Sequence, residues 1–328
     1  MILITGASGL LGANLVLQAS QRNLKITALF HYHKLVYPGL NSIQADLRDK
    51  ELVHNLLRDI QPECIIHCAA MTHVDHCEKY PTAAHRINVG LTRNLSESAN
   101  KLDALFVYIS TDSVFSGHRG NYSEEHIPTP MNEYAKSKYS GEQVVQEELN
   151  SSLILRTNFY GWNMQQKNSL SEWMLSRLES GQILHGFHDV FFSPILVSDL
   201  CEIILDMIER RLTGVYHVTG SQKCSKYEFA HKLAETFDYS TDLVKKLSVK
   251  KAGLKAFRSR NTSLNCDKVS QALGINLPDL ASGLINFKNQ RVIGFESKLK
   301  EMRGEFHDAS NENWQEGNWS PSADLFHC

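Results

Sequence analysis

The chain has 328 residues, of which 42% are hydrophobic and 21% charged, and its formal net charge at pH 7 is -2. This composition excludes disorder throughout and suits one large domain or a large and a small one. The near-neutral charge offers no broad basic surface for nucleic acid or a membrane, and no apolar run approaches the roughly 20 residues that span a bilayer. The seven cysteines form no Cys-x-x-Cys pair, so we expect reduced thiols in a cytoplasmic protein.

The chain begins with an apolar run, residues 2–5, followed by three regularly spaced glycines and an apolar helical segment. This pattern predicts a strand, a phosphate-binding turn and a helix. Glycine is required where the backbone approaches a pyrophosphate, because a Cβ atom would intrude, and the N–H groups of the following helix face the anion. A glycine pattern alone is a weak signal, but its place at the start of the chain favours a dinucleotide. The predicted cofactor residues of this turn are Gly6, Ser8, Gly9, Leu10, Leu11 and Gly12.

Predicted strands and helices alternate over the first half of the chain. Strands are predicted at residues 24–30, 42–47, 63–70 and 104–110, and helices at 50–60 and 82–101; residues 130–138 enter a further helix that runs to about 149. The alternation predicts a Rossmann-like, doubly wound parallel sheet of the α/β class. Right-handed crossovers would bring the strand ends to one edge, where such sheets bind ligands.

After residue 157 the regular alternation breaks down, which indicates a smaller mixed α/β lobe that binds the substrate. Helices are predicted at residues 198–211 and 226–237, and a strand at 215–218. We expect a dinucleotide-binding domain over residues 1–157 and mostly the substrate-binding lobe over 158–288, with some segments returning to the first domain. Residues 289–328 are expected to be a tail, either flexible or used for interaction.

The end of the second predicted strand is where dinucleotide folds place the residue that meets the adenosine ribose. An acidic residue there would bind the ribose 2′-hydroxyl and repel a 2′-phosphate, but the sequence is His31-Tyr-His-Lys34. His31 and Lys34 tolerate the extra negative charge. We therefore favour NADP(H), with NAD(H) as the alternative.

Tyr134 and Lys138 lie four residues apart in a predicted helix. That spacing places both side chains on one face, where an ammonium favours the ionised form of the phenol. A phenol with an ordinary pKa of about 10 then becomes an acid-base group near neutrality. In a carbonyl reduction, Tyr134 would protonate the developing alkoxide, Thr111 would hydrogen-bond the same oxygen, and Lys138 would hold the nicotinamide ribose. The pair alone occurs by chance in many helices, and its place after the phosphate turn and Ser110-Thr111 strengthens the prediction.

These motifs, in this order and spacing, resemble the extended short-chain dehydrogenase/reductase family over about residues 1–285. The resemblance rests on Gly6-x-x-Gly9-x-x-Gly12, Asp46-Leu47, Cys68-Ala69-Ala70, Ser110-Thr111-Asp112 and Tyr134-x-x-x-Lys138. It implies that Asp46, Leu47, Cys68, Ala69 and Ala70 also contact the cofactor.

Within that family, the segments Ser110-Thr-Asp-x-Val-Phe115 and Arg258-x-x-Asn261-x-x-Leu264 resemble the dTDP-4-dehydrorhamnose reductases. The resemblance implies NAD(P)H-dependent reduction of a nucleotide-activated 4-keto-6-deoxy sugar, in the synthesis of cell-surface polysaccharide precursors. It implies a nucleotide-sugar substrate contacted by Asp112, Ser113 and Asn158. Sugar dehydratases of the family carry Asp-Glu where this chain has Asp112-Ser113, so reduction is favoured over dehydration.

Two other functions stay open. A cofactor-bound regulatory subunit, such as the β subunit of methionine adenosyltransferase, resembles these reductases closely, although retention of Thr111, Tyr134 and Lys138 favours an enzyme. An epimerase of nucleotide sugars is the third interpretation. The segment 156–162 departs from the pattern usual in rhamnose reductases, which leaves the sugar undetermined.

Two further segments carry alternatives. Residues 73–77, His-Val-Asp-His-Cys, contain metal-ligand types, yet we predict no metal site because the segment falls in a loop beside the nicotinamide, where it borders the sugar or faces solvent. Trp314 and Trp319 stand among polar residues near the end of the chain. They either belong to a flexible tail or anchor on a partner or a second copy, which leaves a homodimer open.

Overall fold

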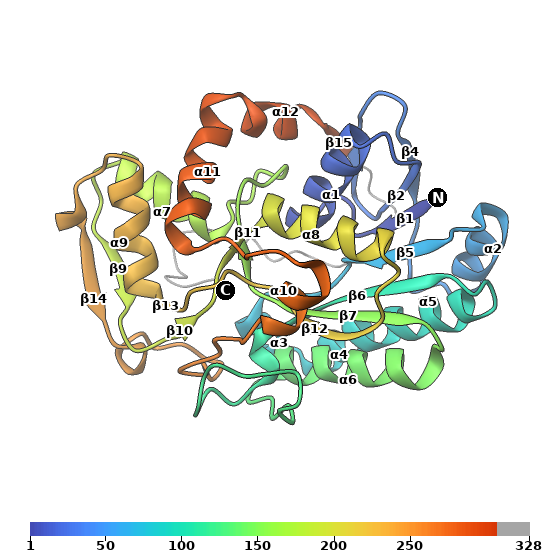
Figure 1. Cartoon of the computed structure of the whole chain (residues 1–328), viewed down its shortest axis with the longest axis horizontal. Coiled ribbons are helices and arrows are strands. Elements are labelled where there is room, and N and C mark those ends of the chain that lie inside the picture. The colour runs from blue at the N-terminus through green and yellow to red at the C-terminus, as the bar shows by residue number, and fades with distance from the viewer. Residues whose placement is uncertain (307–328) are drawn as a thin grey trace.

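The computed structural model describes residues 1–306 and shows a central parallel sheet with helices on both faces (Figure 1). The sheet has seven strands in the order β12-β7-β6-β5-β1-β2-β4. The order reverses between β1 and β5, so the switch point at which such sheets bind ligands lies between these strands. The predicted Rossmann-like, doubly wound fold is confirmed. The strands of the sheet are β1 Ile2–Thr5, β2 Ile26–Phe30, β4 Asn41–Gln44, β5 Cys64–His67, β6 Leu105–Thr111, β7 Ser152–Thr157 and β12 Gly214–His217.

The central strands are buried on both faces, which explains their nearly continuous apolar sequences. Ile2 and Ile4 of β1 share one core cluster with residues of α1 Leu10–Gln21 and α8 Val197–Glu209. Leu3 points to the other face and belongs to the cluster of α2 Lys50–Ile60, α5 Leu91–Asn100 and α6 Glu133–Glu148. The two-residue period of a strand therefore supplies two separate helix-packing surfaces.

A smaller lobe lies at one end of the molecule, beyond the carboxyl ends of the strands (Figure 1). It contains two short ladders, one parallel between β9 and β14 and one antiparallel between β10 and β13. Two elements that follow in the chain belong to the larger domain instead. Helix α8 packs beside α1, and β12 pairs with β7 at the edge of the central sheet. The elements of the lobe are α7 Leu170–Glu179, β9 Leu184–Phe187, β10 Phe191–Phe192, β13 Cys224–Ser225, α9 Lys226–Thr236 and β14 Val244–Leu247, and β8 Phe159–Tyr160 pairs with β11 Ile195–Leu196 where the chain enters and leaves it.

The segment after residue 266 is folded further than expected. It forms α10 Asp267–Leu273, α11 Leu280–Val292, α12 Phe295–Glu301 and β15 Arg303–Phe306. The tail boundary expected at residue 289 was wrong, because it falls inside α11 and because Leu299 and Met302 are buried in the core. β15 pairs antiparallel with β3 His33–Leu35. Trp314 and Trp319 lie outside the described residues.

Two local predictions also differ from the structure. The loop expected after β5 contains a helix, α3 Val74–Lys79, and the long helix expected over residues 82–101 is divided into α4 Pro81–His85, a π-helical turn over Arg86–Gly90, and α5. The buried Asn88 lies in that turn, and its amide bonds both backbone groups of Met71 as well as Ser137 Oγ. π turns inside helices are rare and frequently lie at functional sites. Within residues 1–306, no helix combines the length and apolar character needed to cross a membrane.

Candidate active site

The turn between β1 and α1 forms a tight cradle at the switch point. Gly6 has φ +60, and a Cβ atom there would lie 2.6 Å from the backbone nitrogen of Ala69. A Cβ atom on Gly12 would lie 2.4 Å from the carbonyl oxygen of Gly6. No side chain caps the N-terminus of α1, whose N-cap residue is Gly9. The turn therefore presents close backbone and uncapped helix N–H groups, which fits the diphosphate of a dinucleotide.

The remaining predicted residues of the turn surround this cradle. Leu11 is buried in the core, whereas Ser8 and Leu10 are half-buried. The carbonyl oxygen of Ser8 accepts a hydrogen bond of 3.0 Å from Gln165 Nε2. Gln165 follows β8 along the chain, and the sequence contains no motif that points to it.

Three polar side chains meet at the adenosine end of the predicted cofactor site. Asp46 accepts hydrogen bonds from the Arg48 guanidinium at 2.6 and 2.9 Å, and its Oδ2 lies 3.9 Å from His31 Nε2. Burial disfavours the charge of Asp46, but the hydrogen bonds from Arg48 outweigh it and lower the pKa of the carboxyl. Burial also lowers the pKa of His31. Arg48 was missed by the sequence interpretation, although it stands two residues after the Asp46 motif, and Lys34 lies close by on β3.

The small residues after β5 lie against the end of β1. The Ala69 N–H donates to Thr5 Oγ1 at 3.4 Å, and the same hydroxyl lies 2.7 Å from His67 Nδ1. Burial raises the pKa of Cys68 to about 12, so this thiol is not a nucleophile at neutral pH. Cys68, Ala69 and Ala70 are thus placed at the edge of the sheet that also carries the glycine turn.

The predicted catalytic pair lies in the first two turns of α6. Tyr134 is half-buried, and its carbonyl oxygen accepts a hydrogen bond from Ser137 Oγ at 2.8 Å. Lys138 is only 3% exposed, and its Nζ lies 4.1 Å from the centre of the Tyr108 ring. Burial lowers the pKa of Lys138 to about 7, against the opposing charge of Glu142. The ammonium is therefore poised to gain or lose its proton near neutrality.

Helix α6 is fixed to the sheet by a buried ion pair. Arg156 on β7 and Glu142 on α6 are 4% and 1% exposed, and Arg156 Nη2 lies 2.7 Å from Glu142 Oε2. Ser110 Oγ donates to the same carboxylate, and Tyr108 Oη donates to the carbonyl oxygen of Lys138 at 3.2 Å. These contacts set the position of Lys138 relative to the end of β6.

Thr111 ends β6 and begins a hydrogen-bonded group around a buried carboxylate. Its Oγ1 donates to Asp112 Oδ1 at 3.2 Å and accepts from the Ser113 N–H. Asp112 is 1% exposed, and its Oδ2 accepts from Asn158 Nδ2 at 3.0 Å and from Thr262 Oγ1 at 2.7 Å. Burial raises the pKa of Asp112 despite these hydrogen bonds. The group ties the ends of β6 and β7 to the C-terminal part of the chain.

A cavity lies between this sheet edge and the smaller lobe. The predicted substrate residues Asp112, Ser113 and Asn158 all contribute to its wall. Sequence reasoning predicted none of the other lining residues as substrate contacts, because they come from distant segments; Arg258 was noted only as part of a family motif. These lining residues include Leu170, Met174, His185, Phe187, Val190, Phe192, Lys226, Arg258 and Thr262.

The segment with metal-ligand residue types has structural contacts instead. Asp75 pairs with Arg258 at 2.7 Å and accepts from the Ala256 N–H, and His73 Nδ1 accepts from the His76 N–H at the start of α3. Among residues 1–306, no three His, Cys, Asp or Glu side chains lie close enough together to hold a metal ion. The Asp75–Arg258 pair joins α3 to the loop that precedes Thr262.

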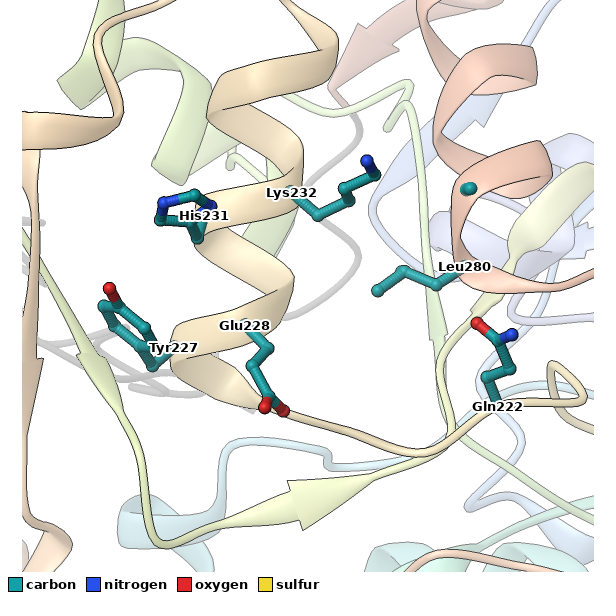
Figure 2. A pocket seen from close by; sticks show the side chains of 7 residues that line it. Gln222, Tyr227, Glu228, His231, Lys232 and Leu280 are labelled. Carbon is teal, nitrogen blue, oxygen red and sulfur yellow. The ribbon is translucent and has the colours of Figure 1, made fainter.

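A second pocket lies at the surface between α9 and the start of α11, and it shares no lining residue with the cavity at Asp112. In Figure 2, Lys232 and Leu280 extend between the two helices, while Tyr227 and His231 lie on the other side of α9. Glu228 is engaged in capping its own helix through Ser225. We assign no chemistry to this pocket.

The fold and the glycine turn together define an α/β protein of the dinucleotide-binding type, with Tyr134 and Lys138 at the start of α6 and a cavity beside Asp112. The family profile described as "RmlD substrate binding domain" matches residues 1–292. The chain therefore belongs to this family, the dTDP-4-dehydrorhamnose reductase-like branch of the extended short-chain dehydrogenases/reductases.

Similar proteins include a subunit of methionine adenosyltransferase and dTDP-4-dehydrorhamnose reductases. The chain is 33% identical over 281 residues to rat (Rattus norvegicus) methionine adenosyltransferase 2 subunit beta, covering 84% of this chain and 82% of the relative. It is 29% identical over 304 residues to dTDP-4-dehydrorhamnose reductase of Aggregatibacter actinomycetemcomitans, covering 88% and 98%. The crystal structure of dTDP-4-dehydrorhamnose reductase from Bacillus anthracis in complex with NADP superposes with a TM-score of 0.79 at 32% identity, covering 88% of this chain and 98% of that one.

Proposed function

We propose that this protein is an NADP(H)-dependent oxidoreductase that reduces the 4-keto group of a nucleotide-activated 6-deoxy sugar. The observation that carries the proposal is the buried Lys138, held one helical turn after Tyr134 and packed on Tyr108 of the strand that ends at Thr111. The glycine cradle at Gly6 and the cavity at Asp112 lie at the same edge of the sheet. The similarity to the Bacillus anthracis reductase, whose structure contains NADP, supports the cofactor and the substrate class.

A reduced nicotinamide, when bound, supplies the hydride for the substrate carbon. Tyr134 gives its phenolic proton to the carbonyl oxygen as that oxygen becomes an alkoxide. The Thr111 hydroxyl, which donates to Asp112 Oδ1 in the structure, turns on substrate binding to donate its one proton to the same oxygen, and it stabilises the developing charge there. Lys138 holds the ribose hydroxyls, and its positive charge stabilises the phenolate that remains on Tyr134. Asp112 lies at the wall of the cavity, where its bonds to Asn158 and Thr262 hold the wall in place.

The proposal is tested by following NADPH absorbance with dTDP-4-keto-6-deoxyglucose and related keto sugars. We expect NADPH oxidation by the wild-type protein and a kcat about 100- to 10,000-fold lower for Tyr134→Phe, because general acid catalysis contributes about this factor. Binding of NADPH, followed by its fluorescence, should persist in the variant. If no keto sugar causes NADPH oxidation, the proposed reduction is wrong. Conversion of a nucleotide sugar without net loss of NADPH would point to an epimerase.

A second candidate is a regulatory subunit that binds the cofactor without turnover. The relative at 33% identity, which is named as a subunit of methionine adenosyltransferase, favours this possibility. It is tested by adding the protein to a methionine adenosyltransferase catalytic subunit and measuring the kinetics of that enzyme. A change that is the same for wild type and Tyr134→Phe would support regulation, whereas no change would reject it.

A further inference from the structure

The cavity beside Asp112 contains a cation, Lys226, that has no anionic partner at hydrogen-bonding distance in the described part of the chain. Lys226 is the first residue of α9, and its side chain lines the cavity. Its Nζ is buried and has no hydrogen-bond partner among residues 1–306. The ammonium lies over the face of the Phe192 ring, whose centre is 3.3 Å away. A cation–π contact of this kind stabilises the charge on one side.

The other guanidinium or ammonium group in the same wall is already paired. Arg258 binds the Asp75 carboxylate through two nitrogens, at 2.7 and 3.3 Å, and donates to the carbonyl oxygen of Ala256 at 3.0 Å. The nearest acidic group in the wall, Asp112, has its Oδ2 occupied by Asn158 and Thr262. The positive charge of Lys226 acts on Asp112 only through space.

A buried ammonium without an anionic partner is costly, and a ligand that brings an anionic oxygen removes that cost. The position of Lys226 indicates which part of a nucleotide-sugar substrate would bring that oxygen. Lys226 comes from the smaller lobe, where it begins α9, whereas the reacting carbonyl is proposed to lie beside Thr111 at the end of β6. The anionic part of a nucleotide sugar is its diphosphate, which is attached at the far side of the sugar ring from the 4-keto group.

We propose that Lys226 binds an anionic oxygen of the diphosphate in the nucleotide-sugar substrate, with Phe192 holding the side chain in place. The inference rests on the proposed function for the class of substrate. It assigns to Lys226 a role in substrate binding that is separate from proton transfer. Because the Lys226 ammonium makes no hydrogen bond within residues 1–306, its loss should weaken binding of the diphosphate without disturbing the cofactor site.

The experiment measures binding of dTDP, UDP and GDP by titration calorimetry to the full chain saturated with NADP⁺. Lys226→Met is only one heavy atom shorter and stays apolar beside Phe192, so the variant is expected to fold. We expect it to weaken binding of the preferred diphosphate about 10- to 100-fold, which is the effect of one charged hydrogen bond. Lys226→Arg retains the positive charge, so its affinity for the diphosphate should fall less than that of Lys226→Met. Lys223→Met is the matched control, because Lys223 is exposed and lies outside the cavity wall.

The outcomes separate this inference from the proposed function. Equal binding by wild type and Lys226→Met overturns the inference, and so does the absence of any binding by wild type to all three diphosphates. If Lys226→Met binds the nucleotide sugar more weakly but binds the nucleoside diphosphate as wild type does, Lys226 contacts the sugar and not the diphosphate. That result also overturns the inference. None of these results affects the proposed reduction, which NADPH oxidation with keto sugars tests independently. An equal loss in Lys223→Met would show a general effect of surface charge and reject a specific contact.

Discussion

At the scale of single residues, the site depends on an amine whose charge is not guaranteed by its chemical type. An exposed lysine is fully protonated at neutral pH, but burial lowers the pKa of Lys138 to about 7. The nearby carboxylate of Glu142 opposes this effect, since it favours the ammonium. The protonation state of Lys138 is therefore set by the packing around α6.

This pKa gives a prediction for the pH dependence of catalysis. Lys138 must be protonated to favour the phenolate of Tyr134, and the free protein loses that proton as the pH rises through about 7. We expect kcat/KM to fall above this pH, because kcat/KM reports the ionisations of the free enzyme. Lys138→Arg keeps its charge, so it should be slower but should show the decline at higher pH. An identical pH profile for the two proteins would contradict this prediction.

At the scale of elements, the position of α6 depends on the buried pair between Glu142 and Arg156. Removing one partner leaves the other charge buried and uncompensated, which costs about 3 to 5 kcal/mol of unfolding free energy. We expect Glu142→Gln and Arg156→Met each to show losses of this size in urea unfolding. The double variant should lose clearly less than the sum, because no unpaired charge remains. Additive losses would show that the two residues do not stabilise the protein as a pair.

The pairing of β15 with β3 offers a second prediction at this scale. β3 contains Lys34 and lies next to the predicted adenosine site, while β15 joins it from the far end of the described chain. Two truncated chains, ending after residue 302 and after residue 306, differ only in β15. We expect the shorter one to have a Tm lower by a few degrees and a higher Kd for NADPH, because β3 loses its ladder partner. Equal values for the two chains would show that β15 supports neither property.

At the scale of the whole molecule, two buried histidines connect stability to pH. His67 is 1% exposed and His217 is fully buried, and burial lowers the pKa of each to about 3. An unfolded histidine has a pKa of about 6.5, so the unfolded chain binds protons that the folded chain does not between these two values. Stability is therefore fully present above pH 6.5 and is lost as the pH falls toward 3.

The contribution of one histidine can be isolated by a variant. We expect the unfolding free energy of the wild-type protein to fall more steeply between pH 6.5 and 4 than that of His67→Asn. The difference in slope should approach about 1.4 kcal/mol per pH unit, which corresponds to one proton. Urea unfolding at several pH values measures the slope of unfolding free energy against pH for each protein. The carboxylates contribute equally to both slopes, so the difference between the slopes reports His67 alone. Parallel slopes would mean that His67 is protonated in the folded protein.

The sequence by itself determined the features that depend on short-range spacing. The apolar runs and glycines identified the first strand, the turn and the helix, and the four-residue spacing placed Tyr134 and Lys138 on consecutive turns of α6. Such features follow from the periodicity of strands and helices, which is visible within a few consecutive residues. The alternation of strands and helices was enough to predict the parallel sheet.

Only the tertiary structure decided which distant groups meet at the site. Asp112 and Thr262 are 150 residues apart, and Asp75 and Arg258 are 183 apart, so no local pattern relates them. The same is true of β3 and β15, and of Lys226 and the cavity that it lines. Contacts of this kind exist because the smaller lobe and the last helices pack over the sheet edge, and burial in that packing also sets the charges of Lys138 and His67.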